Sequence, residues 1–183
     1  MPPIYLPAQG TPKFWSPDYF IPTIAHFDPQ VLKQGGIEAV AFDVDNTLTS
    51  HKGTAIDDDI KAGLERFESV FPPYKIAIIS NTKSEERKGQ LKEMFPNYYI
   101  SKSEHKKPHP EPFIDVERQM KYHPNQMALF DDLIFTGIAG GNARGWTTIK
   151  VEPLYPKSDP LFHKVQRAFD YLAIKYTLFA GRI

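Results

Sequence analysis

Apolar and polar positions along the 183-residue chain form two kinds of segment. Short, nearly continuous apolar runs are typical of strands that are buried on both faces of a parallel sheet. Between them, apolar residues recur every three or four positions, as they do in amphipathic helices. Strands are expected at 40–42, 75–79, 98–100, 127–130 and 146–151, and helices at 29–34, 57–70, 82–95, 113–120 and 135–142. This alternation predicts an α/β, Rossmann-like parallel sheet with helices on both faces.

Two aspartates stand at the end of the first apolar run, in the segment Phe42-Asp43-Val44-Asp45-Asn46-Thr47. Side chains alternate along a strand, so Asp43 and Asp45 begin on the same side of the chain. Two carboxylates at the carboxyl end of a parallel strand suit a hard cation and phosphate chemistry. A calcium loop is disfavoured, because Leu48 and Thr54 stand where such a loop needs Gly and Glu. The Asp-x-Asp-x-Thr pattern resembles the first motif of the haloacid dehalogenase (HAD) superfamily of phosphohydrolases.

Three further polar clusters follow in the order that this resemblance requires. Ser80 and Asn81 follow the second apolar run, Lys107 precedes a helix, and Asp131-Asp132 follow the fourth run. Because ligands bind outside the carboxyl ends of parallel strands, we expect these clusters to gather at one edge of the sheet. Ser80 alone would suggest a turn or a helix cap, and Lys107 alone a solvated loop. The prediction of a phosphate site therefore depends on the order and spacing of all the clusters together.

The residue types suggest a mechanism of phosphate transfer. Asp43 is the candidate nucleophile and would form an aspartyl-phosphate. Asp45 would protonate the leaving oxygen and then activate water, which requires a pKa well above the roughly 3.9 of a free Asp. Ser80 and Asn81, with N–H groups at a helix start, would hold phosphate oxygens, and Lys107 would offset the negative charge. Mg²⁺ would bind Asp43, the backbone carbonyl of Asp45 and one aspartate of the fourth cluster.

The stretch from Phe135 to Pro153, with Gly140-Gly141-Asn142 near its centre, is similar to the fourth motif of the capless YqeG-type HAD phosphatases. That group includes the phosphatidylglycerophosphate phosphatases of bacteria, mitochondria and plastids. Its members also tend to open with an aromatic-Pro segment and to end in a basic amphipathic helix. The likeness covers about residues 14–175. The intervals between the motifs leave no room for an inserted cap domain, so an open site is expected.

One motif departs from the family pattern, which is usually Gly-Asp-x-x-x-x-Asp. Aligned on Gly140-Gly141-Asn142, this chain has Asp131 in place of the glycine and Gly137 in place of the last acid. The alignment puts Asp132 at the metal-ligand position, which gives Asp43, Asp45 and Asp132 as the predicted magnesium site. Asp131 is the alternative ligand.

The favoured function is a Mg²⁺-dependent phosphatase that removes phosphate from the phospholipid phosphatidylglycerophosphate, as the resemblance implies. One alternative is a phosphatase for a soluble monoester or a phosphoprotein, which could reach an open site equally well. Another is a non-catalytic Mg²⁺-binding module that binds partners through its aromatic arm. Asp45 argues against that module, because a structural metal site does not need a general acid.

Composition removes several classes of function. The 22 basic residues balance the 22 acidic ones, so no net charge draws the chain to nucleic acid. The absence of cysteine excludes disulfides and a Cys nucleophile. No apolar run approaches the roughly 20 residues of a membrane span, and the amino terminus lacks a signal-peptide pattern. We therefore expect a protein of the cytoplasm or an organelle matrix, soluble or peripheral to a membrane. His105 and His109 are interpreted as surface residues.

Two end segments flank the predicted phosphatase core at 37–156. The arm at 1–36 is rich in proline and aromatic residues, which either pack on the domain or contact a membrane or partner. A basic amphipathic helix is predicted within 157–183, with Asp159 as its cap and Pro160 at its first position. Its apolar stripe either packs on the core or lies on an anionic membrane. The stripe comprises Leu161, Val165, Ala168, Phe169, Leu172, Tyr176 and Phe179, and the basic residues are Lys164, Arg167, Lys175 and Arg182.

Overall fold

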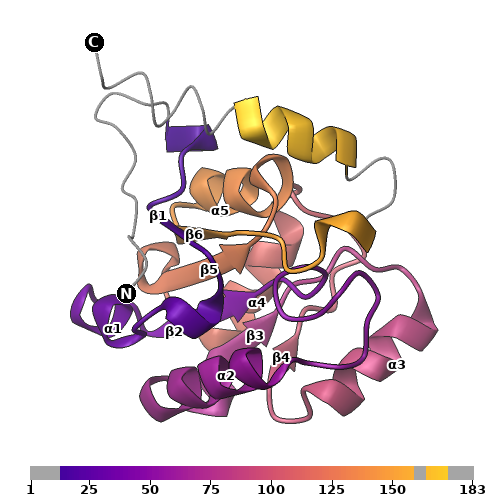
Figure 1. Ribbon diagram of the computed structural model, residues 1–183. Helices are drawn as coiled ribbons and strands as arrows, with labels where there is room; N and C mark the ends of the chain where they lie inside the picture. Colours follow the sequence, from indigo (N-terminus) through magenta and orange to yellow (C-terminus); the bar gives the residue numbers. More distant parts are fainter. Residues whose placement is uncertain (1–12, 159–163, 173–183) are drawn as a thin grey trace.

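The computed structural model describes residues 13–158 and 164–172. Its centre is a six-stranded sheet in which all neighbouring strands are parallel, in the order β1-β6-β5-β2-β3-β4 (Figure 1). The strands are β1 (Tyr19–Ile21), β2 (Ala39–Phe42), β3 (Ile76–Ile78), β4 (Tyr99–Ile100), β5 (Met127–Asp131) and β6 (Thr147–Val151). The predicted Rossmann-like α/β fold is confirmed.

Helices connect the strands at or near the predicted positions. They are α1 (Gln30–Gln34), α2 (Asp58–Val70), α3 (Glu85–Met94), α4 (Glu111–Met120) and α5 (Ala139–Arg144), with a π-helical turn η5 (Ile134–Ile138) directly before α5. Short 3₁₀ turns are η1 (Lys13–Trp15), η2 (Ile24–His26), η3 (Pro73–Lys75), η4 (Pro124–Gln126) and η6 (Pro156–Ser158). A last helix spans 164–172. The predicted start of α3 at Thr82 is wrong: Ser84 is the cap, and its hydroxyl accepts a bond from the Arg87 N–H.

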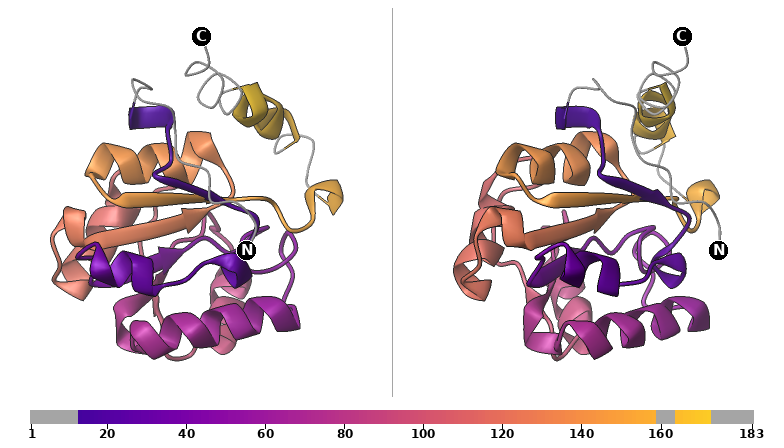
Figure 2. Two further views of the ribbon diagram at one scale, coloured as in Figure 1. Left: turned by 60° about the vertical axis from the view of Figure 1, so that its left-hand side comes forward. Right: turned by 90° about the vertical axis from the view of Figure 1, so that its left-hand side faces the viewer.

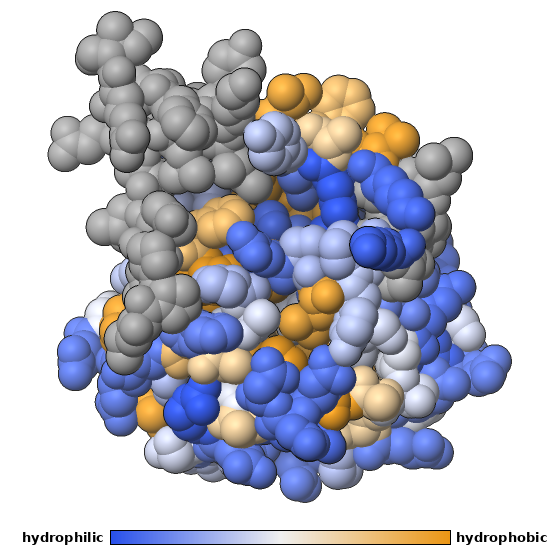
Figure 3. All heavy atoms as spheres, in the orientation of Figure 1, coloured by the Kyte–Doolittle hydropathy of each residue, from blue (hydrophilic) through white to orange (hydrophobic). Residues whose placement is uncertain are grey.

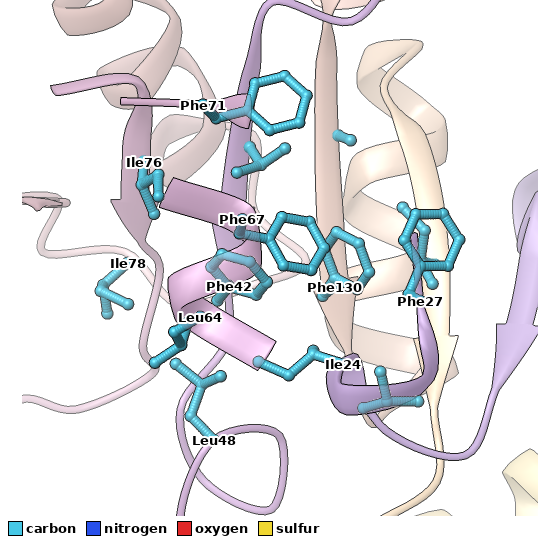
Figure 4. Packing of buried hydrophobic residues seen from close by; sticks show 14 of the residues in the cluster. Ile24, Phe27, Phe42, Leu48, Leu64, Phe67, Phe71, Ile76, Ile78 and Phe130 are labelled. Carbon is cyan, nitrogen blue, oxygen red and sulfur yellow. The ribbon is translucent and has the colours of Figure 1, made fainter. Parts of the chain in front are cut away.

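Two hydrophobic clusters cover opposite faces of the sheet, with α2 on one side and α5 on the other (Figure 2). Side chains alternate along β2, so Val40 and Phe42 enter the cluster with α2, while Ala39 and Ala41 enter the cluster with α4. Figure 4 shows the rings of Phe42, Phe67 and Phe130 packed together, with centroids 5.0–5.1 Å apart. Burial on both faces explains why β2, β3 and β5 appear as apolar runs in the sequence.

Part of the predicted N-terminal arm belongs to the sheet, which the sequence did not indicate. Strand β1 pairs with β6, at the sheet edge opposite β4. Phe27 is only 2% exposed and packs against Phe67 and Phe130 in the core. The packing interpretation therefore holds for Phe27, whereas Phe14 and Trp15 are 43% and 37% exposed.

Helix 164–172 turns its polar side toward the core. Asp170 is 3% exposed, and its carboxylate accepts a bond from the Ile134 N–H at 3.0 Å. Val165, Phe169 and Leu172 are 48%, 57% and 49% exposed. Figure 3 shows apolar side chains gathered on the outer side of this helix, at the top of the view. The alternative in which this stripe packs on the core is wrong for these residues.

Part of the predicted helix lies outside the described residues. This part comprises its Asp159 cap, the stripe residues Leu161, Tyr176 and Phe179, and the basic residues Lys175 and Arg182. Within the described ranges, no helix combines the length and the apolar character that crossing a bilayer requires.

The order of the strands fixes where a ligand can bind. From β2 the chain proceeds outward to β3 and β4, and then returns to form β5 and β6 on the other side of β2. The carboxyl ends of β2 and β5 therefore form a topological switch point, where open α/β sheets bind ligands. Phe42 lies opposite Phe130 in the register, so Asp43 and Asp131 leave the sheet side by side.

Candidate active site

Lys107 joins two aspartates at this switch point. Its Nζ lies 2.6 Å from Asp43 Oδ1 and 2.5 Å from Asp131 Oδ2. All three residues are at least nine-tenths buried, with exposed fractions of 8% for Asp43, 4% for Lys107 and 1% for Asp131. Three residues from separate parts of the chain thus form one charged cluster, as the strand-end positions of Asp43 and Asp131 and the place of Lys107 in the motif order led us to expect.

Burial is the main influence on the charges of this cluster. It raises the pKa of Asp43 well above its usual value, and Asp131 and Asp132 raise it further, while Lys107 opposes the shift. Burial alone would lower the pKa of Lys107, but Asp131 and Asp43 outweigh it, so that pKa is raised. The cluster thus favours the charged form of Lys107, while burial of Asp43 favours the neutral form of its carboxyl group.

Asp131 is held in place on both sides. Its Oδ1 accepts a bond from the Leu133 N–H at 2.8 Å, and its Oδ2 binds Lys107. A Cβ atom added at Gly137 would lie only 1.9 Å from that Oδ2. The carboxylate of Asp131 therefore occupies the space into which a side chain at 137 would extend.

Asp132 lies deep in the same region and contacts the last helix. It is 2% exposed, and Arg167 Nη2 binds its Oδ2 at 2.6 Å. Burial and the neighbouring Asp131 raise the pKa of Asp132 to about 6, against the influence of Arg167 and Lys150. Arg167 was predicted as part of a basic helix surface. In the structure it contributes to the site instead.

The carboxylate of Asp45 contacts a guanidinium group and a backbone N–H group. Its Oδ1 accepts bonds from Arg87 Nη2 at 3.0 Å and from the Lys52 N–H at 2.9 Å. His51 Nδ1 lies 3.8 Å from Oδ2. These partners fix the carboxylate on the side of the site formed by α3 and the loop after β2.

Asn81 supports Lys107 through the backbone. Its Oδ1 accepts the Lys107 N–H at 2.7 Å, and its Nδ2 donates to the Lys107 carbonyl at 3.2 Å. Asn81 also lines the pocket. Its contact with a phosphate group stays a prediction. Ser80 follows β3 as expected, but the residues that line the pocket do not include it.

A pocket of about 820 Å³ connects these groups. Asp43, Asp45, Lys107, Asp131 and Asp132 all line it. Sequence reasoning missed other residues that line it, from the loop after β2, from α3, from η5 and from the last helix. They include His51, Lys52, Arg87, Phe135 and Gln166. An aromatic side chain extends one wall, since Trp15 packs against Phe135 with ring centroids 4.7 Å apart.

No group of three or more His, Asp or Glu side chains within 13–158 and 164–172 is already arranged to hold a metal ion. His105 and His109 are exposed and stack on each other, with ring centroids 4.0 Å apart. They lie on the surface, as predicted.

The family relationship agrees with this site. The model of the mitochondrial PGP phosphatase family matches residues 9–155, which include every predicted site residue. The chain belongs to this family. The family model and both curated relatives reported below bear phosphatase names, which agrees with the order of the motifs.

Two curated proteins are similar to this PGP phosphatase family member along most of its length. Phosphatidylglycerophosphate phosphatase 1, chloroplastic/mitochondrial, of Arabidopsis thaliana is 28% identical over 174 residues, which are 92% of this chain and 50% of that protein. The Bacillus subtilis protein named "Probable phosphatase YqeG" is 29% identical over 143 residues, 78% of this chain and 80% of that one. The chain thus spans half the length of the plant relative.

A solved structure shares the fold. An uncharacterized protein from Listeria monocytogenes serotype 4b aligns with a TM-score of 0.54 and 20% identity, over 76% of this chain and 99% of that one.

The Gly140-Gly141-Asn142 segment, on which the resemblance partly rested, has a structural role in this family member. Asn142 Nδ2 donates to the carbonyls of Lys13 and Ser16 at 2.6 and 2.9 Å. Gly140 allows close packing, since a Cβ there would lie 2.5 Å from the Phe113 ring. This segment joins η1, α4 and α5 and takes no direct part in the chemistry.

Proposed function

We propose that the protein is a Mg²⁺-dependent phosphomonoesterase that hydrolyses phosphatidylglycerophosphate through an aspartyl-phosphate on Asp43. The observation that carries the chemistry is the ammonium of Lys107, buried between Asp43 and Asp131 at the floor of a pocket. It supports the proposal because Asp43 would then be a carboxylate nucleophile beside a fixed positive charge that could bind phosphate.

One oxygen of Asp43 is better suited to attack than the other. Lys107 binds Oδ1, and among the described residues no hydrogen bond to Oδ2 is formed. Oδ2 can therefore attack phosphorus while Lys107 stabilises the charge on the phosphoryl oxygens. Asp45, the other acid of the first motif, would deliver a proton to the leaving oxygen and later accept one from water. Asn81 keeps Lys107 in position through its backbone, and Ser80 is proposed as a more distant phosphate contact.

The residues present fit a magnesium ion. Asp43 and Asp132 offer carboxylate oxygens, which Mg²⁺ prefers, and Asp45 offers its backbone carbonyl. Burial raises the pKa of both Asp43 and Asp132 although each is paired with a basic residue, so additional positive charge beside them would favour their ionised forms. Bound Mg²⁺ would supply that charge and polarise the phosphate.

Phosphatidylglycerophosphate is favoured over a soluble monoester by two features. The family and the plant relative bear the name of that activity. The pocket also lies beside exposed apolar surface, because helix 164–172 contributes Gln166 to its lining while Phe169 faces outward. An amphipathic helix of this kind can bury its apolar face in a bilayer interface.

A substrate panel tests the proposal. Phosphate release from phosphatidylglycerophosphate in vesicles, glycerol 3-phosphate and a phosphoserine peptide would be measured with Mg²⁺ and with a chelator. We expect Mg²⁺-dependent release that is fastest from the lipid and absent in Asp43→Asn. Faster turnover of the peptide would refute the lipid assignment, and turnover by Asp43→Asn would refute the mechanism.

Membrane contact is proposed through the outward face of helix 164–172. Lys164 is exposed there, whereas Arg167 is bonded to Asp132. We expect the double variant Phe169→Ser, Leu172→Ser to bind anionic vesicles several-fold more weakly than wild type in a flotation assay. Tyr74→Ser is the matched control, since Tyr74 is 71% exposed on η3, before the amino end of β3. Equal binding by wild type and the double variant would remove this proposal.

A further inference from the structure

Arg87 is a buried cation in the pocket that the chemistry at Asp43 does not use. It is only 6% exposed, although it lies in the first turn of α3 and its neighbours along the helix are accessible. Its Nη1 donates to the Gly53 carbonyl at 3.0 Å and to Gln90 Oε1 at 3.2 Å, and its Nη2 donates to Asp45. The guanidinium is thus held rigidly against the pocket by the loop after β2 and by α3.

One donor of this guanidinium is unused. Nε of Arg87 is buried and has no hydrogen-bond acceptor within the described part of the chain. A buried N–H group without an acceptor is costly, so Arg87, which lines the pocket, keeps one unsatisfied donor. A guanidinium that already holds Asp45 through Nη2 can still receive an anion along its Nε edge.

Positive charge is concentrated around Arg87. Lys52 and Lys83 line the same pocket, and neither forms an ion pair with any residue that the structure describes. The same lining also holds the carboxylates of Asp45, which pairs with Arg87, and of Glu86. Three basic residues therefore stand against two acids on this side of the pocket, which leaves an excess of positive charge for an anionic group.

We propose that Arg87, with Lys52 and Lys83, forms a second anion subsite, which binds the phosphodiester group of a substrate whose phosphomonoester reacts at Asp43. The inference rests on the proposed function and adds to it the residues that would bind the second phosphate group of the substrate. Guanidinium groups bind phosphate oxygens through charge-assisted, bidentate hydrogen bonds. A pocket of about 820 Å³ is far larger than one phosphate group needs.

Two soluble compounds isolate the subsite from any membrane effect. The deacylated headgroup, glycerophosphoglycerol phosphate, carries a diester and a monoester, whereas glycerol 3-phosphate carries only the monoester. We expect wild type to show a higher kcat/KM for the headgroup. Arg87→Ala should lower kcat/KM for the headgroup roughly 10- to 100-fold more than for glycerol 3-phosphate, mainly through KM. Arg87→Lys, which keeps the charge, should restore part of the preference.

Lys88→Ala is the matched control. It removes one basic residue from the next position of α3, where Lys88 pairs with Glu85 and Glu104 and does not line the pocket. We expect its substrate preference to equal that of wild type. An equal loss for both substrates in Arg87→Ala would overturn the subsite, since it would show a purely structural role.

A binding measurement separates this inference from the proposed function. In the Asp43→Asn background, calorimetry should show that the headgroup binds more tightly than glycerol 3-phosphate, and that Arg87→Ala removes the difference. Failure to hydrolyse the intact lipid would count only against the proposed function. Equal affinity of the two compounds before and after Arg87→Ala would refute the subsite, whether or not the lipid is turned over.

Discussion

Gly137→Ala is a small change that should disable the site by displacing one carboxylate. The new Cβ would lie 1.9 Å from Asp131 Oδ2, 2.1 Å from its Cγ and 2.5 Å from its Cβ. Real Cβ contacts essentially never fall below 3.0 Å, so the carboxylate must retreat by about 1.1 Å. The same oxygen holds Lys107 at 2.5 Å, and Lys107 in turn holds Asp43. The displacement therefore reaches the nucleophile.

Two magnitudes follow from this geometry. A hydrogen bond to a charged group contributes about 1.5–3 kcal/mol, so losing the Lys107–Asp131 bond should lower the free energy of unfolding by about that amount. A misplacement of about 1 Å in a catalytic constellation can lower the rate by roughly 100-fold. We therefore expect a folded protein with a reduction in kcat of roughly that size.

Urea unfolding and phosphate release would measure both effects. Gly89→Ala is the control, because Gly89 lies inside α3 and a Cβ there meets nothing within 4 Å. It should leave kcat unchanged and stabilise the protein by roughly 0.5–1 kcal/mol. In the Asp131→Gly background, Gly137→Ala should cause little further loss, because the clash is gone. A Gly137→Ala enzyme within twofold of wild type, or a full second loss in that background, would refute the reasoning.

Three further variants test the roles of the aspartates. Asp43→Asn should abolish turnover while the thermal unfolding curve shows an intact fold, and residual activity in a folded protein would contradict a carboxylate nucleophile. Asp45→Asn should slow hydrolysis of alkyl phosphates by roughly 10²–10⁴-fold and of aryl phosphates with good leaving groups much less, so an equal loss on both would argue against general acid catalysis. Asp132→Ala should raise the Mg²⁺ concentration for half-maximal activity far more than Asp131→Ala, and the reverse order in a Mg²⁺ titration would move the ligand role to Asp131.

The parts of the site that could be predicted from the sequence are those at strand ends. Asp43 and Asp131 follow apolar runs, and a parallel sheet brings the carboxyl ends of such runs together. The register of β2 and β5 does place these two residues side by side. Lys107 could be included because its place in the motif order resembled a known family. Ser80 satisfied the same argument but does not line the pocket, since position after a strand does not determine which way a side chain points.

Arg87 and Arg167 could not be predicted, because no local pattern marks them. Arg87 lies 42 residues from Asp45, and Arg167 lies 35 residues from Asp132. In sequence each looks like an ordinary basic residue on a helix. Only the packing of α3 and of helix 164–172 against the carboxyl edge of the sheet brings Arg87 into the pocket lining and Arg167 onto Asp132. Strand β1 was missed for a similar reason: three residues between prolines pair with β6 through tertiary structure alone.

Helix 164–172 shows why periodicity predicts a helix more reliably than it predicts the direction the helix faces. An apolar stripe normally faces a core, because the sheet or helix that it meets is also apolar. This helix meets the polar edge of the sheet, where Asp132 and the N–H of Ile134 need partners. Arg167 and Asp170 satisfy them, so the inward side is charged and the stripe with Phe169 is left outside. Because the same helix both holds Asp132 and exposes apolar surface, a lipid that contacted this surface would lie directly beside the proposed active site.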